Sequence, residues 1–181
     1  MKLNYKILNE KSELLERIEA LSKEVFPPDE LVAPLKISQY FCKNEENSTK
    51  MLAFFDNENF VGFSGIFEYE NLIYLGFLAI EPRLQNKGYG SKILKELKET
   101  FADKILVLEI EKIDENAENN AERIKRAKFY EKAGFFDSLH SISYLGITYE
   151  IYSNALNFKP DAFRKMFNDF SQKSNFSFIL E

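Results

Sequence analysis

The stretch LIYLGFLAIEPRLQNKGYGSKILKELKETF, residues 72–101, decides the fold of this chain. Its first nine residues, Leu72–Ile80, are nearly all apolar, which is typical of a strand buried on both faces. Pro82 ends that strand because it has no amide hydrogen to donate to a ladder. Between Ser91 and Phe101, apolar residues recur at helical spacing among lysines and glutamates. The stretch is therefore predicted to form a strand, a short loop and a helix.

The loop between this strand and helix contains Gly88 and Gly90. Glycine adopts unusual backbone angles and lets a ligand approach the main chain closely. Amides at the start of a helix lack partners within it, and together with the helix dipole they suit a phosphate or pyrophosphate. Two spaced glycines alone would favour an ordinary turn without a ligand. Their spacing matches neither the G-x-G-x-x-G fingerprint nor a Walker A loop.

Two motifs resemble those of a known family. Gln85–Gly90 (QNKGYG) is similar to the (Gln/Arg)-x-x-Gly-x-(Gly/Ala) loop of the GNAT superfamily of acyl-CoA-dependent N-acyltransferases. Phe129–Phe135 (FYEKAGF) closely resembles the Leu/Phe-Tyr-x-x-x-Gly-Phe helix ending of that superfamily. Gly134 suits a helix end that needs a left-handed residue. The resemblance covers roughly residues 1–153 in element order, and it is specific at Leu78–Ser91 and Phe129–Phe135.

The expected elements follow the order that this family has. They are a strand at 3–8, a helix at 13–26, a less regular helix with Ile37, Tyr40 and Phe41, antiparallel strands at 50–55 and 60–69, the stretch above, a strand at 104–110, a polar loop at 114–122, a helix up to Gly134, and two strands within 136–153 that break near Gly146. The resemblance implies an α/β (α+β) fold of GNAT type. Such a fold has a mixed, mostly antiparallel sheet with helices on both faces and a splayed central strand pair.

Residues 1–153 are expected to form the acetyltransferase domain. Residues 154–181 are expected to add a C-terminal helix and a tail, read as an edge strand or an anchor, packed on the same domain. Two alternatives for this segment stay open at this point. It could cover part of the acceptor cleft, or it could form the contact of a homodimer.

Composition and charge restrict the classes of function. The net charge of −5 argues against a nucleic-acid partner, because phosphate binding needs a basic surface. No apolar run approaches the ~20 residues of a membrane span, and the first residues lack a signal-peptide core. Cys42 is the single cysteine, so no intrachain disulfide can form. We therefore expect a cytoplasmic protein with no membrane or nucleic-acid partner.

The resemblance implies acetyl-CoA as the co-substrate. Backbone groups of Leu78 and Ile80 would pair with the pantetheine arm as an added strand does, and the loop amides would hold the pyrophosphate, with Lys87 adding positive charge. The implied cofactor-binding residues are Leu78, Ala79, Ile80, Gln85, Asn86, Lys87, Gly88, Tyr89, Gly90 and Ser91.

The resemblance also implies a general acid. Tyr130 stands where many family members place the tyrosine that protonates the departing sulfur of coenzyme A. The alternative is that this tyrosine only packs the helix against the sheet. His140 is the single histidine, and its position on a strand favours a structural role with no metal cluster nearby.

The general base is the less defined part of the chemistry. Some family members carry a glutamate on the central strand, but that position is Tyr74 here. Glu109 is the first choice as base because apolar residues surround it in the sequence. Glu111, which shares its strand face, and Glu68 and Glu70 remain alternatives.

One position departs from the family pattern. Many members have a cofactor-contacting asparagine seven residues before the helix tyrosine, and that position is Arg123 here. Arg123 or Arg126 could instead reach a phosphate of coenzyme A, or Asn119 or Asn120 could supply the amide.

The sequence thus predicts an N-acetyltransferase. It would move an acetyl group from acetyl-CoA to a primary amine of a small molecule or peptide, by direct transfer in a ternary complex. A second hypothesis is a non-catalytic acyl-CoA-binding module of the same fold. A third is an unrelated phosphate-binding protein, which the second motif disfavours.

Overall fold

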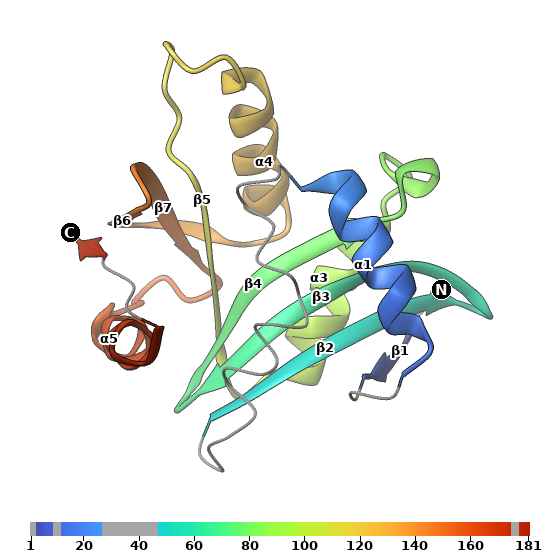
Figure 1. Ribbon diagram of the computed structural model, residues 1–181. Helices are drawn as coiled ribbons and strands as arrows, with labels where there is room; N and C mark the ends of the chain where they lie inside the picture. Colours follow the sequence, from blue (N-terminus) through green and yellow to red (C-terminus); the bar gives the residue numbers. More distant parts are fainter. Residues whose placement is uncertain (1–2, 9–11, 27–46, 175–177) are drawn as a thin grey trace. The chain divides into compact units, whose positions relative to one another are not determined.

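The structure, a computed structural model, describes residues 3–8, 12–26, 47–174 and 178–181 (Figure 1). These residues form two compact units, the first ending at Ala102 and the second beginning at Asp103. The helix expected around Ile37, Tyr40 and Phe41, and Cys42 beside it, lie outside the described residues.

The first unit is built on four antiparallel strands that neighbour one another in chain order. They are β1 (Asn4–Ile7), β2 (Asn47–Asp56), β3 (Asn59–Tyr69) and β4 (Leu72–Ile80). Two-residue turns join β2 to β3 and β3 to β4, and their first residues, Asn57 and Glu70, have φ angles of 56° and 51°. Such left-handed turns fit the twist of adjacent antiparallel strands. The predicted pair of antiparallel strands is confirmed.

Helices cover the two faces of this sheet, and Figure 1 shows one in front of the strands and one behind them. The elements are α1 (Leu14–Val25), α3 (Tyr89–Thr100) and the 3-10 helix η1 (Pro82–Leu84), which leads from β4 to α3. Ile18 and Leu21 of α1 are buried against apolar side chains of β2, β3 and β4. The apolar stripe predicted for α3 is buried as well, at Ile93, Leu94 and Leu97. Burial of these stripes places the start of α3 beside the end of β4.

Gly76 forms a bulge in β4. Gly65 of β3 pairs with Phe77, and the next residue of β3 pairs with Leu75, so Gly76 is the extra residue. A Cβ atom at Gly76 would lie 2.8 Å from Cε2 of Phe67, which leaves no room for a side chain. A bulge of this kind bends the strand and increases its twist. The bulge thus sets the direction in which the C-terminal half of β4 runs.

The second unit contains a four-stranded antiparallel sheet and two helices. Its strands are β5 (Ile105–Glu111), β6 (Phe136–Tyr144), β7 (Ile147–Ser153) and β8 (Ile179–Leu180), in the order β5-β7-β6-β8, and its helices are α4 (Asn120–Lys132) and α5 (Asp161–Ser174). The predicted break near Gly146 is a two-residue turn in which Leu145 and Gly146 have φ angles of 51° and 80°. The tail forms an edge strand, since Leu180 pairs with Ile142 of β6.

The predicted loop at 114–122 is wrong at its end, because α4 begins at Asn120. The carbonyl of Asn119 accepts hydrogen bonds from the amides of Glu122 and Arg123 at 3.0 and 3.1 Å. The side chain of Asn120 accepts a bond from the amide of Asp114 at 3.1 Å. Polar residues at a helix start satisfy the backbone in this way, so a polar stretch does not by itself mean a loop.

The fold class is confirmed as α/β with mostly antiparallel strands. The predicted splay concerns β4 and β5, which belong to different units, and it stays a prediction. Among the described residues, no helix has both the length and the apolar character needed to cross a membrane.

Candidate functional site

The backbone groups of Leu78 and Ile80 point away from β3. The amide of Glu81 donates to the carbonyl of Val61 at 3.0 Å, so these two residues form a hydrogen-bonded pair. Hydrogen-bonded and non-hydrogen-bonded pairs alternate along an antiparallel ladder, and the register has no shift between Glu81 and Leu78. Ala79 therefore bonds to β3. Leu78 and Ile80 direct their N–H and C=O groups to the other edge of β4.

A tight turn and two left-handed residues carry the chain from β4 into α3. The amide of Gln85 donates to the carbonyl of Pro82 at 3.2 Å, and its side-chain nitrogen donates to the carbonyl of Ile80 at 3.2 Å. Asn86 has a φ angle of 60° and Gly88 one of 81°. A Cβ atom on Gly88 would meet nothing within 4 Å. The main chain at Gly88 is therefore accessible to a ligand.

The first turn of α3 presents amides that no side chain caps. Gly88 is the N-cap residue, and no side-chain hydrogen bond is made there. The amide of Lys92 bonds to the carbonyl of Gly88 at 3.2 Å, as the helix pattern requires. The amides of Tyr89, Gly90 and Ser91 come before that bond and have no acceptor within the helix. The first turn also has no acidic residue, so this end of α3 favours an anion.

Side chains fix this loop on the first unit. The hydroxyl of Tyr89 donates to Oδ2 of Asp56 at 2.7 Å, and Nζ of Lys92 lies 4.6 Å from the centroid of the Tyr89 ring. The hydrogen bond to the Asp56 carboxylate raises the pKa of Tyr89, so the phenol stays a neutral donor at pH 7. Glu81, just before η1, accepts bonds from Nε and Nη2 of Arg17 at 3.1 and 2.8 Å. The loop is thus held in place without a ligand.

The predicted cofactor-binding residues are brought together by the first unit. They form one connected segment from the end of β4 to the first turn of α3. The loop residues exposed to solvent are Gln85, Asn86, Lys87, Gly88 and Ser91. Tyr74, which occupies the position of the family glutamate, packs its ring 5.5 Å from that of Phe67 in the same unit.

The position of Tyr130 is fixed by the hydrogen bonds that end α4. The amide of Phe135 donates to the carbonyl of Tyr130 at 3.0 Å, and that of Gly134 donates to the carbonyl of Glu131 at 2.9 Å. With a φ angle of 79° at Gly134, these bonds form a Schellman motif. The rings of Tyr130 and Phe135 meet edge to face with centroids 6.0 Å apart. The second sequence motif therefore has a local cause, because its glycine ends the helix and its last phenylalanine packs on the tyrosine.

The acid–base state of Tyr130 suits a proton donor. Burial raises the pKa of Tyr130 to about 12, and the positive charge of Arg126 lowers it in part. Tyr130 therefore carries its proton throughout the neutral pH range. Its ring also contacts that of Phe129, with centroids 5.0 Å apart.

Glu109 lies in β5, opposite the buried Ile151 of β7, and is itself partly buried. The hydroxyl of Tyr144 donates a hydrogen bond to Oε1 of Glu109. The ring of Tyr144 in turn stacks on that of Tyr149, with centroids 4.7 Å apart. Glu109 thus has an apolar residue opposite it and a tyrosine partner, and that tyrosine could not be read from the sequence.

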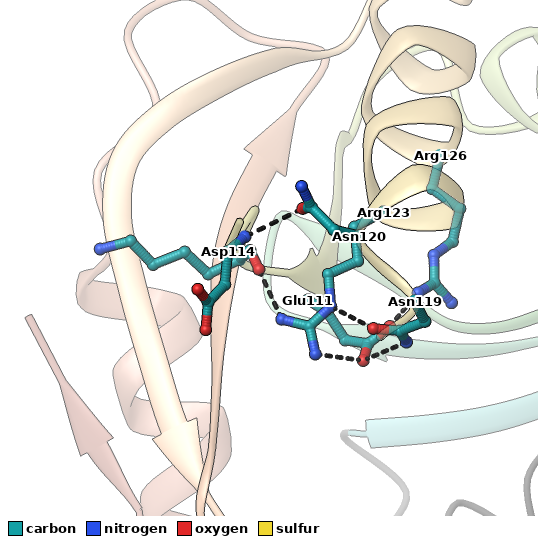
Figure 2. A network of polar contacts seen from close by, with 7 residues as sticks. Glu111, Asp114, Asn119, Asn120, Arg123 and Arg126 are labelled. Carbon is teal, nitrogen blue, oxygen red and sulfur yellow. Dashed lines mark hydrogen bonds and ion pairs between the residues drawn. The ribbon is translucent and has the colours of Figure 1, made fainter. Parts of the chain in front are cut away.

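The most extensive polar network of α4 surrounds Glu111, whose side chain is 8% exposed (Figure 2). Nη2 of Arg123 lies 3.1 Å from Oε1 of Glu111, and Nη2 of Arg126 bonds to Oε2. Nδ2 of Asn119 also donates to Oε1, at 3.1 Å. Nε and Nη1 of Arg123 donate to Oδ1 of Asn119 at 2.8 Å and to the carbonyl of Lys112 at 2.7 Å. The last residue of β5 thus holds the first half of α4.

Sequence reasoning named these residues singly but did not find the network. The signal was their spacing, because Asn119, Arg123 and Arg126 recur at intervals of four and three residues and share one side of a helix. Every nitrogen of the Arg123 guanidinium has an acceptor within the second unit. The side chain of Arg126 is 42% exposed, against 16% for that of Arg123. No His, Cys, Asp or Glu residues in the described ranges form a group of three that could hold a metal ion.

Comparisons with known proteins agree with the two motifs. The model of the acetyltransferase (GNAT) family matches residues 15–135, which include both of them. A comparison with curated proteins gave no match.

Several solved structures share the fold. A protein from Bacteroides thetaiotaomicron described as a GNAT-family acetyltransferase is 18% identical, with a TM-score of 0.71 over 96% of this chain and 98% of that one. An aminoglycoside 6′-N-acetyltransferase complexed with coenzyme A is 15% identical, with a TM-score of 0.61 over 87% and 99% of the two chains. The ribosomal-protein-S18-alanine N-acetyltransferase of Escherichia coli is 15% identical, with a TM-score of 0.61 over 88% and 97%. At these identities the similarity shows the fold.

Proposed function

Because this chain belongs to the acetyltransferase (GNAT) family, we propose that it moves an acetyl group from acetyl-CoA to a primary amine of a small molecule or peptide. Membership of the family supports acyl transfer from coenzyme A as the class of activity. The observation that carries the finer proposal is the uncapped, glycine-bearing start of α3 directly after β4.

This segment offers the two features that acetyl-CoA would need. The amides of Tyr89, Gly90 and Ser91 and the positive end of α3 suit the pyrophosphate. The backbone groups of Leu78 and Ile80, directed away from β3, suit the amides of pantetheine, which would bind as a strand does. The open space at Gly88 would let the phosphates approach the main chain. The exposed Lys87 would add charge.

The chemistry needs an acid and a base. The amine nitrogen attacks the thioester carbonyl, so that a carbon–nitrogen bond forms and the carbon–sulfur bond breaks. Tyr130 gives its proton to the departing sulfur, and Glu109, directly or through water, takes the proton that the amine loses. A backbone amide near Ile80 would polarise the carbonyl. Tyr130 is protonated at neutral pH, as the acid role requires.

An amine acceptor is supported by what similar structures are named for. Those names include an aminoglycoside and an alanine of ribosomal protein S18, both acetylated on nitrogen. The net charge of −5 favours a cationic acceptor, since a negative field raises the local concentration of cations.

One observation favours a second candidate, a non-catalytic acyl-CoA-binding module. The position of the family's strand glutamate is occupied by Tyr74, which packs against Phe67. Such a module would bind acetyl-CoA and release no coenzyme A.

The test is a panel of amines incubated with acetyl-CoA, with released coenzyme A and acetylated amine both measured. Acetylation of an amine at a rate that Tyr130→Phe lowers would support the enzyme. Acetyl-CoA should also raise the melting temperature more than a nucleotide without pantetheine does. Stabilisation without turnover on any amine would favour the binding module, and no stabilisation would contradict both candidates.

A further inference from the structure

We propose that Arg126, held by Glu111, is a positioning residue for the acid Tyr130, and that its charge stabilises the phenolate that forms when Tyr130 gives up its proton. This inference rests on the proposed function, because it assigns a partner to the acid of that reaction.

The helix places the two side chains together. Arg126 and Tyr130 are four residues apart in α4 (Asn120–Lys132), so they lie one above the other on the same side of the helix. The end of α4 fixes Tyr130 through its bonds with Phe135, and Glu111 fixes Arg126. Arg126 and Tyr130 are therefore each held by a residue that lies outside α4.

The charges around Glu111 do not cancel. One carboxylate faces the guanidinium groups of Arg123 and Arg126, so the cluster has a formal charge of +1. Glu111 is buried, and charges at buried sites are poorly screened by salt. The Nε atom of Arg126 is buried too, and within the described part of the chain it has no hydrogen-bond acceptor. The cluster as a whole is therefore positively charged, and Arg126 is its member four residues before Tyr130.

The charge of Arg126 opposes the effect of burial on Tyr130. Burial disfavours the phenolate form of Tyr130, as its pKa of about 12 shows, and Arg126 acts in the opposite sense. A cation already in place costs no rearrangement at the moment of proton transfer. The bond to Glu111 keeps the half-exposed Arg126 from turning into solvent.

The experiment is a double-mutant cycle on acetyl transfer. Arg126→Gln should lower kcat by about tenfold, the effect of weakening the acid by one pKa unit, and should leave the Kd for acetyl-CoA unchanged. Arg126→Lys, which keeps the charge, should recover most of the rate. In a Tyr130→Phe background, Arg126→Gln should cause no further loss.

Arg123→Gln is the matched control. It removes a partner from the same carboxylate but lies two helical turns from Tyr130, so it should lower the melting temperature at least as much as Arg126→Gln and leave kcat within about twofold of wild type. Equal losses from Arg126→Gln with and without the Tyr130 hydroxyl would overturn the inference and assign Arg126 a structural role. An unchanged kcat with weaker binding of acetyl-CoA, but not of dephospho-CoA, would also overturn it and assign Arg126 to a cofactor phosphate.

These outcomes are separate from failure of the proposed function. If Tyr130→Phe reacts at the wild-type rate, the acid assignment fails whatever Arg126 does. If no amine is acetylated, the ultraviolet absorbance of tyrosinate during an alkaline titration provides the readout, because Arg126→Gln should raise the pKa of Tyr130. An unchanged titration of Tyr130 in Arg126→Gln would then overturn the inference.

Discussion

The hydroxyl of Tyr89 donates a hydrogen bond to Oδ2 of Asp56 at 2.7 Å. This bond joins the first turn of α3 to the last residue of β2, so the start of the helix is anchored to the sheet. The anchor lies next to the amides proposed to bind the pyrophosphate. We therefore expect the order of that loop to affect the affinity for acetyl-CoA.

Removing the hydrogen bond between Tyr89 and Asp56 should weaken the binding of acetyl-CoA. Tyr89→Phe keeps the ring beside Lys92 but loses the hydroxyl, so we expect the Kd for acetyl-CoA to rise a few-fold, as measured by calorimetry. Asp56→Asn, which keeps an acceptor oxygen, should have a smaller effect. Identical affinities for wild type and Tyr89→Phe would show that the loop is ordered without this bond.

A negative charge introduced at Gly88 should reduce the affinity for acetyl-CoA more than it reduces the stability of the fold. Gly88→Glu would place a carboxylate where the pyrophosphate is proposed to lie, and we expect binding of acetyl-CoA to be lost in calorimetry. The control is Gly146→Glu, because Gly146 has nearly the same φ angle, 80°, and a Cβ atom there would also meet nothing within 4 Å. Each variant should lose about 1 kcal/mol of stability for a left-handed residue. Equal affinity in the two variants would refute the loop assignment.

Loss of the Glu111 carboxylate should be costly to stability. Glu111→Ala leaves two guanidinium groups without their shared partner, and we expect the free energy of unfolding to fall by about 3 kcal/mol in urea titrations. The exposed pair of Glu19 and Lys23 is the comparison, and Glu19→Ala should change stability by no more than about 0.5 kcal/mol. Similar changes in the two variants would mean that the Glu111 network adds no more than a surface pair.

Alkaline pH should reveal the raised pKa of the Tyr130 phenol. The pKa of Tyr130 is raised from 10 to about 12, so between these values the folded chain keeps a proton that the unfolded chain has lost. The free energy of unfolding therefore decreases as pH rises through this window. Tyr130→Phe removes this contribution and should show a shallower decrease in urea titrations from pH 10 to 12. Burial and nearby carboxylates also raise the pKa of Tyr152 to about 12, so Tyr152→Phe should likewise make the decrease shallower. Parallel curves for wild type and Tyr130→Phe would contradict a raised pKa of Tyr130 in the folded chain.

Local patterns explain what could be predicted from the sequence. The apolar run of β4, the stripe of α3 and the turn at Gly146 depend on neighbours within a few residues, and all are present as expected. The motif around Gly134 is likewise local, because the hydrogen bonds that end α4 span only a few residues. The connected loop at the end of β4 follows from these elements.

What could not be predicted depends on partners distant in the sequence. The bulge at Gly76 is fixed by the register with β3 and by the ring of Phe67. Glu111 belongs to a strand and its partners to a helix, so the spacing along either element shows only half of the network. The polar residues Asn119 and Asn120 predict a loop, so the start of α4 is predicted too late. In the structure, Asn120 accepts a bond from the amide of Asp114 and Asn119 donates to Glu111.

The central claim is that the pyrophosphate of acetyl-CoA binds to the main-chain amides at the start of α3. A crystal structure of the protein with acetyl-CoA tests it most directly. The account predicts phosphate oxygens within hydrogen-bond distance of the amides of Tyr89, Gly90 or Ser91, with pantetheine along Leu78 and Ile80. Acetyl-CoA bound at another site, with these amides facing only solvent, would contradict it.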